Sequence, residues 1–192
     1  MEKSSVDSNI EAVFIGGSAG SLEVLFRLLP LLMPEIKPAI IITLHRRSMG
    51  DSSLTDLLAT KTVLPTREAE DKDVILPGHI YLAPSDYHLL IEKNRTFSLD
   101  DSEKVNFSRP SLDVTFETAA DTFGSRAAGI ILSGANDDGT KGLMALKKAG
   151  GIVIAQDPLT AQMPLMPQYA IRHIHVDFIF DTVRIAHFIN SL

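Results

Sequence analysis

The sequence predicts an α/β fold with three layers, in which a mainly parallel, doubly wound sheet lies between helices and carries a β-hairpin insertion. Apolar strand-like runs recur at 12–16, 39–44, 80–83, 128–132 and 151–155, and amphipathic helical stretches separate several of them. The run AIIITL at 39–44 is apolar almost throughout, which indicates burial on both faces of a parallel sheet. Residues 79–100 are typical of a hairpin, with Asn94 and Arg95 near its turn.

Composition limits the class of protein. The chain has 192 residues and 45% hydrophobic content, which is enough to bury one core. We expect a short polar tail at residues 1–10 and a single domain at residues 11–192. The net charge of −6 argues against nucleic acid as a partner, and the lack of cysteine excludes disulfides, thiolate metal sites and a cysteine nucleophile. No signal pattern or long apolar segment occurs, so we expect a cytoplasmic protein without membrane insertion.

The first strand runs into the turn of VFIGGSAGSLE, where Ser18 stands between glycines ahead of a helical stretch. Free N–H groups at a helix start can hold a phosphate or an oxyanion, so the turn suits a nucleotide-binding protein or a hydrolase. Dinucleotide binding fits poorly because the turn lacks G-x-G-x-x-G, and no G-K-[ST] follows as a P-loop requires. A simple N-cap role for Ser18 is an equal alternative.

Two further strands also end in chemically useful side chains. His45 follows the second strand, and Asp137 and Asp138 follow the fourth, in SGANDDGTKG. Active residues of such sheets gather at the C-terminal strand ends, so serine, histidine and aspartate are expected to meet as nucleophile, base and orienting carboxylate. Their chain order differs from the Ser, Asp, His order of α/β-hydrolases. The alternatives are a surface histidine, and aspartates that cap the helix beginning near Gly139.

The remaining histidines indicate no metal site. His173 and His175 alternate in an expected approach to a strand, but no further ligands stand at suitable spacing. His79, His88 and His187 are interpreted as surface or turn residues.

The sequence resembles the catalytic domain of the bacterial chemotaxis protein-glutamate methylesterases over nearly its whole length. The resemblance rests on the serine turn, the strand ending in His45, and the segments LPGHIYLAPSDYHLLIE, SRPSLDVTFETAA, LSGANDDGTKGLMALKKAGG and AQDPLTAQMPLMPQYAI. It implies a cofactor-free carboxylic-ester hydrolase that removes methyl groups from glutamates on the cytoplasmic helices of chemoreceptors, releasing methanol, and in some cases deamidates receptor glutamines.

The resemblance also implies roles for single residues. Ser18 matches the nucleophile, His45 the general base and later acid, and Asp138 the orienting carboxylate, which leaves Asp137 as the expected helix cap. Arg109 is the first residue of a family motif. It either helps to shape the site or is a structural residue at the start of a helix. The positions implied near the substrate or oxyanion are Ala19, Gly20, Arg46, Ala135 and Met166, the last paired with Pro167.

The chain departs from the family pattern around these residues. Ala19 replaces a hydroxyl residue, Arg46-Arg47 replaces Met-Pro, Ala135-Asn136 replaces Met-Gly, and Leu165 replaces a glycine. These changes support an alternative function, a catalytically altered or inactive module that docks a receptor or signalling partner through the same cleft. Arg46 and Arg47 are either contacts for acidic groups on a receptor or a solvated pair.

The family usually carries an N-terminal receiver domain. Only about ten residues precede the first strand here, so no receiver domain is expected, and any regulation would come from a separate regulatory protein.

Overall fold

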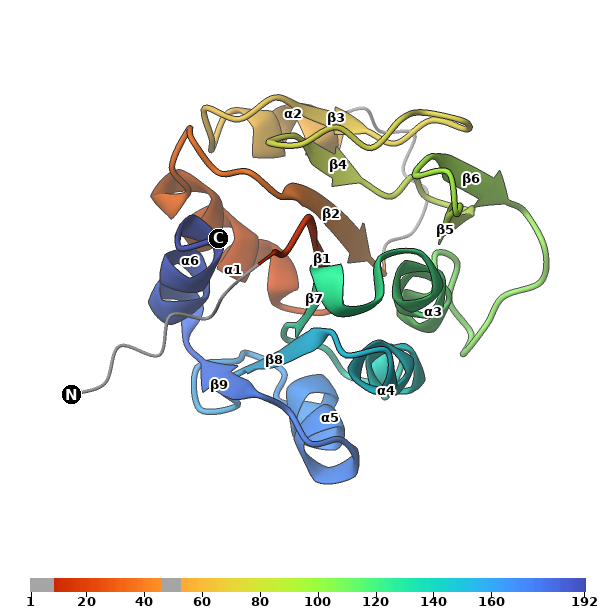
Figure 1. Cartoon of the computed structure of the whole chain (residues 1–192). Helices are drawn as coiled ribbons and strands as arrows, with labels where there is room; N and C mark the ends of the chain where they lie inside the picture. Colours follow the sequence, from red (N-terminus) through yellow and green to blue (C-terminus); the bar gives the residue numbers. More distant parts are fainter. Residues whose placement is uncertain (1–8, 46–52) are drawn as a thin grey trace.

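The computed structural model describes residues 9–45 and 53–192, and it contains the predicted sheet between two layers of helices (Figure 1). Seven strands form the sheet in the order β3-β4-β2-β1-β7-β8-β9, and each neighbouring pair is parallel. These strands are β1 (Ala12–Gly17), β2 (Ala39–Leu44), β3 (Thr66–Glu68), β4 (Ile80–Leu82), β7 (Ala127–Ile131), β8 (Ile152–Gln156) and β9 (Phe178–Phe180). The chain builds outward from β1 in both directions, as a doubly wound fold requires.

The helices divide between the two faces of the sheet (Figure 1). They are α1 (Ser21–Leu28), α2 (Ser53–Ala59), α3 (Leu112–Phe123), α4 (Thr140–Lys148), α5 (Leu165–His173) and α6 (Thr182–Asn190), with 3-10 turns η1 (Leu29–Leu31) and η2 (Gly124–Arg126). One core cluster joins the sheet to α1, α2 and α6, and a second joins it to α3, α4 and α5. Every residue of β1 and β2 is buried, which explains why their sequences lack polar alternation.

The predicted hairpin forms outside the main sheet. Strands β5 (His88–Ile91) and β6 (Phe97–Asp100) pair antiparallel, and Arg95 lies in the turn with a φ of 65°. Two threonines of α3 hold the hairpin edge: the N–H of Ile91 donates to Thr118 Oγ1 at 3.1 Å, and Thr122 Oγ1 donates to Ile91 O at 3.0 Å. Residues 80–82 belong to the main sheet as β4, as their own apolar run predicted.

Some local predictions were wrong. His173 does not approach a strand but lies in the last turn of α5, where its ring stacks on Tyr169. His88 is not a surface residue: it lies in β5 and is 1% exposed. The three-residue strands β3 and β9 were not predicted; both are only partly buried, unlike the equally short but fully buried β4.

The turn between β1 and α1 depends on Gly20 rather than on a serine cap. Gly20 is the N-cap with a φ of 82°, and no side chain caps the helix, so the N-cap reading of Ser18 was wrong. A Cβ at position 20 would lie 2.7 Å from Ser133 Oγ and 2.8 Å from the Gln162 side chain. Ser21 Oγ donates to Ser18 O at 2.5 Å, which closes the turn. In the described ranges, no helix is long and apolar enough to cross a membrane.

We expect Gly20→Ala to destabilise the protein more than Gly150→Ala. Both glycines have a positive φ, 82° and 88°, but a Cβ at position 150 would come no closer than 3.3 Å to another side chain. The left-handed conformation alone costs about 1–2 kcal/mol, and overpacking at position 20 adds about 1–3 kcal/mol. Urea unfolding of the two variants measures the difference; equal losses would show that the space at Gly20 is not limiting.

Candidate active site

The ends of β1, β2 and β7 bring Ser18, His45 and the 133–138 loop together. The N–H of His45 donates to Gly17 O at 3.1 Å, so His45 leaves β2 beside the residue that precedes Ser18. The N–H of Ser18 donates to Ser133 O at 2.9 Å, which ties the same turn to the end of β7. Ser18 therefore stands between the histidine and the acidic loop, as the sequence predicted for a site at a switch of strand order.

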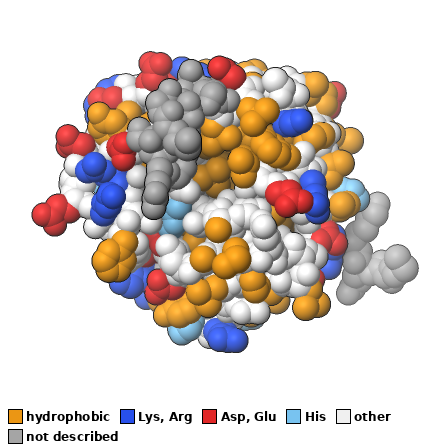
Figure 2. All heavy atoms as spheres, turned by 180° about the vertical axis from the view of Figure 1, so that it is seen from behind, with side chains coloured by type: hydrophobic (Ala, Val, Ile, Leu, Met, Phe, Trp, Pro, Cys, Tyr) orange, Lys and Arg blue, Asp and Glu red, His pale blue; other side chains and the backbone are white. Residues whose placement is uncertain are grey.

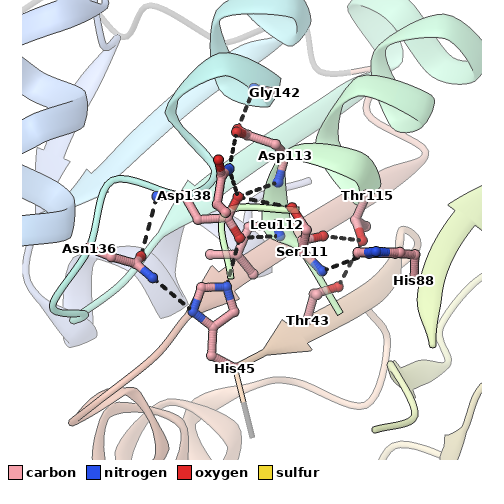
Figure 3. A network of polar contacts seen from close by, with 11 residues as sticks. Thr43, His45, His88, Ser111, Leu112, Asp113, Thr115, Asn136, Asp138 and Gly142 are labelled. Carbon is pink, nitrogen blue, oxygen red and sulfur yellow. Dashed lines mark hydrogen bonds and ion pairs between the residues drawn. The ribbon is translucent and has the colours of Figure 1, made fainter. Parts of the chain in front are cut away.

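The histidine and the second aspartate form a direct pair (Figure 3). His45 Nε2 lies 2.7 Å from Asp138 Oδ2, and the two side chains are 10% and 0% exposed. The pair joins residues 93 positions apart in the chain. Because the carboxylate takes Nε2, the nitrogen left for proton transfer is Nδ1, the reverse of the assignment in chymotrypsin-type sites.

The buried Asp138 carboxylate is held by the N-terminal end of α3. The N–H of Leu112 donates to Oδ2 at 2.7 Å, and the N–H of Asp113 donates to Oδ1 at 3.2 Å. Ser111 Oγ and Asn106 Nδ2 donate to the same Oδ1 at 2.9 and 2.7 Å. Free backbone donors and the helix dipole both favour an anion at this position.

These contacts keep Asp138 ionised. Burial alone raises the pKa of its carboxyl, but hydrogen bonds from His45, Asn106 and the Leu112 N–H outweigh burial and hold the pKa below the ordinary value of 3.8. A charged carboxylate beside the imidazole can stabilise the imidazolium that forms when His45 takes a proton.

A second buried carboxyl, Asp113, lies next to the first. Its Oδ1 accepts from the N–H of Gly142 at 2.9 Å, and its Oδ2 accepts from Asn106 Nδ2 at 2.8 Å. Burial raises the pKa of Asp113, the Gly142 hydrogen bond opposes the rise, and the charge of Asp138 adds to it; the net shift is upward. Asp113 thus serves the first turn of α4, the task that the sequence assigned to Asp137.

The cap prediction for Asp137 was wrong. Helix α4 has Gly139 as its N-cap with no side-chain hydrogen bond, and Asp137 is exposed. Of the two neighbouring aspartates, Asp138 is the one whose buried carboxylate contacts His45.

The other imidazole nitrogen faces an amide. Asn136 Nδ2 lies 3.4 Å from His45 Nδ1, and Asn136 Oδ1 accepts from the N–H of Asp138 at 3.3 Å (Figure 3). Within the described residues, no hydrogen bond joins Ser18 Oγ to His45. Hydrogen bonds between catalytic groups are often long or unformed before substrate binds, so the lack of this hydrogen bond does not argue against catalysis.

Ser133 supports the turn that carries the candidate nucleophile. Its Oγ donates to Ala19 O at 2.7 Å and accepts from the N–H of Met163 at 2.9 Å. Its N–H donates to Gln156 Oε1 at 2.9 Å, deep in the sheet. Ser133 was not predicted as a site residue, because an isolated serine at a strand end carries no distinctive signal in the sequence.

The residues that hold Asp138 were also not predicted from the sequence. Ser111 is fully buried, and its N–H donates to Nδ1 of the buried His88 at 3.1 Å. Ser111 and Asp113 both lie in the segment SRPSLDVTF, whose N-cap pattern ahead of an apolar helix was a readable signal. Asn106 and Asn136 lie in loops, and no sequence pattern marked either of them as a site residue.

The remaining predicted site residues differ in placement. Ala19 directly follows the serine and Ala135 lies in the 133–138 loop; both are exposed, and their N–H groups donate no hydrogen bond within the described part of the chain. Met166 is fully buried behind the acidic loop, where its N–H donates to Gly134 O at 3.0 Å. Arg109 donates to the carbonyls of Asp101 and Ser102 and so braces the loop before α3. Arg46 lies outside the described residues, as does Arg47.

A cavity of about 480 Å³ opens next to the nucleophile turn. Its lining includes Gly20 and Gln162, the charged residues Glu23, Arg27 and Asp181, and the exposed apolar residues Leu31, Leu159 and Val183. Figure 2, which views the molecule from behind, shows hydrophobic and uncharged atoms over much of the middle of that face. Across the described ranges, no group of three or more His, Asp or Glu side chains is placed to hold a metal ion.

Comparisons with known proteins agree with this geometry. Residues 13–189 match the model of a family described as CheB methylesterase. The crystal structure of the Thermotoga maritima CheB methylesterase catalytic domain superposes with a TM-score of 0.90 at 32% identity, over 95% of this chain and 98% of that one.

Sequence relatives fall into two groups by length. A protein from Leptospira interrogans is 43% identical over 178 residues, which make up 93% of this chain and 92% of that protein. A Chromohalobacter salexigens protein, named protein-glutamate methylesterase/protein-glutamine glutaminase, is 36% identical over 167 residues. The match covers 85% of this chain but 47% of that protein, so the chain spans about half its length.

The raised pKa of Asp113 predicts how stability depends on pH. The folded state holds this proton more tightly than the unfolded chain, so the contribution of Asp113 to stability falls as pH rises from about 3.8 through the folded pKa. Asp113→Asn removes that loss, and the stability of the variant relative to wild type should therefore increase with pH above about 3.8.

Urea unfolding at a series of pH values measures this difference, and any pH-independent change from altered hydrogen bonding subtracts out. Asp121→Asn, at an exposed position of the same helix, controls for removing one charge. A relative stability of Asp113→Asn that does not change with pH would contradict the assignment of a raised pKa.

Proposed function

The chain belongs to the CheB methylesterase family, and on that premise we propose that it hydrolyses glutamate γ-methyl esters on chemoreceptors with Ser18, His45 and Asp138 as the catalytic triad. The proposal rests chiefly on one observation, the 2.7 Å contact between His45 Nε2 and the fully buried, ionised Asp138 beside the serine turn. Names of relatives such as the Chromohalobacter salexigens protein also include glutamine glutaminase, and we extend the proposal to deamidation at the same site.

In the proposed reaction, Ser18 Oγ attacks the ester carbonyl carbon while His45 Nδ1 takes the hydroxyl proton. The tetrahedral intermediate then collapses, the bond to the methoxy oxygen breaks, and that oxygen receives the proton from Nδ1 and leaves as methanol. Water attacks the resulting acyl-serine by the same route, which releases the glutamate acid and restores Ser18. Each step uses the imidazole first as base and then as acid.

The environment of Asp138 supports this role for His45. The carboxylate fixes the imidazole with hydrogen on Nε2, which leaves the Nδ1 lone pair for the serine proton. Because donors from α3 satisfy the carboxylate, it stays charged and can stabilise the imidazolium without taking the proton itself.

The N–H groups of Ala19 and Ala135 are the proposed oxyanion donors. Both residues are exposed, and neither N–H donates a hydrogen bond in the described part of the chain. A backbone donor does not depend on side-chain identity, so replacement of a hydroxyl residue by Ala19 leaves it intact.

Two features favour an active enzyme over a binding module that uses the same cleft. A fully buried carboxylate beside a histidine side chain that is only 10% exposed is costly to assemble and offers little surface for docking a partner. Asn106, Ser111 and the N–H of Leu112 also donate to the Asp138 carboxylate and hold it in the charged form that the proposed reaction requires.

For the substrate, we propose that a receptor helix lies over the cavity beside Gly20. Its exposed apolar residues Leu31, Leu159 and Val183 can accept the apolar face of a helix, and Gly20 of the serine turn lines the same cavity.

We expect Ser18→Ala to reduce methanol release from a peptide that carries a glutamate γ-methyl ester by about 10⁴-fold or more, because triad members act as a unit. Gas chromatography of methanol measures the rate, and mass spectrometry of the quenched reaction detects the acyl-serine in wild type only. Ser125→Ala, at an exposed position outside the proposed site, is the matched control. Wild-type activity in Ser18→Ala would exclude the covalent route.

We expect Asp138→Asn to lower the same activity by about 10⁴-fold, because an amide at this position no longer favours the productive imidazole tautomer. Asp137→Asn should stay within a few-fold of wild type, since Asp137 is exposed and its side chain makes no contact with His45. Steady-state rates on the methyl-ester peptide compare the two variants, and the reverse ranking would move the carboxylate role to Asp137.

A further inference from the structure

We propose that Asn136 is a catalytic residue that donates a hydrogen bond to the leaving alkoxy oxygen of the ester. The inference rests on the proposed function and deepens it, because it adds a group that acts on bond cleavage rather than on serine attack. It is carried by the position of the Asn136 amide at the nitrogen that is expected to pass the proton to the leaving group.

Hydrogen bonding fixes the direction of the amide. Asn136 Oδ1 accepts from the N–H of Asp138 at 3.3 Å, so the oxygen end points toward the backbone and the NH₂ end toward the imidazole. With Nε2 donating to Asp138, Nδ1 carries a lone pair and accepts from Asn136 Nδ2 at 3.4 Å. At 3.4 Å this hydrogen bond is long and easily broken, since such bonds are usually 2.7–3.2 Å.

The contact cannot persist through the reaction. Once Nδ1 takes the serine proton, Nδ1 and Nδ2 both carry hydrogen, and the two donors face each other. The N–H of the protonated Nδ1 then donates to the leaving oxygen, and an N–H of Asn136, whose nitrogen lies 3.4 Å from Nδ1, can reach the same oxygen. The amide donor is thus released when negative charge begins to develop on that oxygen, so it stabilises the transition state more than the ground state.

The chemistry of the leaving group makes the role specific. A methoxy oxygen has two lone pairs, so it can accept the proton from Nδ1 and a hydrogen bond from Asn136 together. A 4-nitrophenoxy group leaves readily as a delocalised anion and gains little from a donor. Loss of Asn136 should therefore slow alkyl esters selectively, whereas disturbance of Ser18 or His45 should slow both kinds of ester.

The test compares Asn136→Ala with wild type on one peptide whose glutamate side chain carries either a γ-methyl or a γ-4-nitrophenyl ester. We expect kcat for the methyl ester to fall about 10- to 100-fold with little change in KM, while hydrolysis of the nitrophenyl ester stays within about 2-fold of wild type. Retained nitrophenyl hydrolysis also proves that the variant is folded. Asp137→Ala, which truncates the exposed neighbour, should leave both rates unchanged.

Equal losses on the two esters would overturn the proposal, since they would mean that Asn136 only positions His45. An unchanged methyl-ester rate would overturn it as well, with the proposed function intact. If the wild-type protein hydrolyses the nitrophenyl ester but releases no methanol from the methyl ester, the proposed function fails and the role of Asn136 with it.

Discussion

The site depends on the burial of the Asp138 carboxylate against the first turn of α3. A fully buried charge is destabilising unless donors surround it, and here those donors come from three parts of the chain. Backbone N–H groups arrive from the start of α3, a side-chain amide from the preceding loop at Asn106, and an imidazole from the end of β2. Each of these segments must therefore adopt its place for the carboxylate to be stable, which links the active geometry to the fold.

That requirement extends into the hairpin. Ser111 donates to Asp138 from the N-cap position of α3, and the buried His88 of β5 accepts from the N–H of Ser111 (Figure 3). His88 Nε2 in turn bonds Glu103 O in the loop after the hairpin. The hairpin insertion therefore contacts the end of α3 that holds the buried Asp138 carboxylate.

The same network contains an electrostatic conflict. Asp113 and Asp138 are both buried and share Asn106 as a donor, and the charge of Asp138 contributes to the raised pKa of Asp113. Asp113 also bonds the N–H of Gly142, so it joins the starts of α3 and α4. The arrangement places two helix ends around one acidic pair, and its unfavourable repulsion is offset by the hydrogen bonds that the two carboxyls accept.

The sequence by itself determined five of the seven strands of the main sheet, the helical stretches between several of them and the strand ends at which Ser18, His45 and Asp138 stand. These features follow from apolar runs and turn residues, which are local patterns in the chain. Only the tertiary structure decided that His88 is buried, that Asp113 rather than Asp137 bonds the first turn of α4, and that Asn106, Ser111 and Asn136 belong to the site. Most of those contacts join residues that are far apart in the chain, and a single polar side chain in a loop has no periodicity. Its role depends on which distant donor or acceptor the packing of the helices brings within hydrogen-bonding distance.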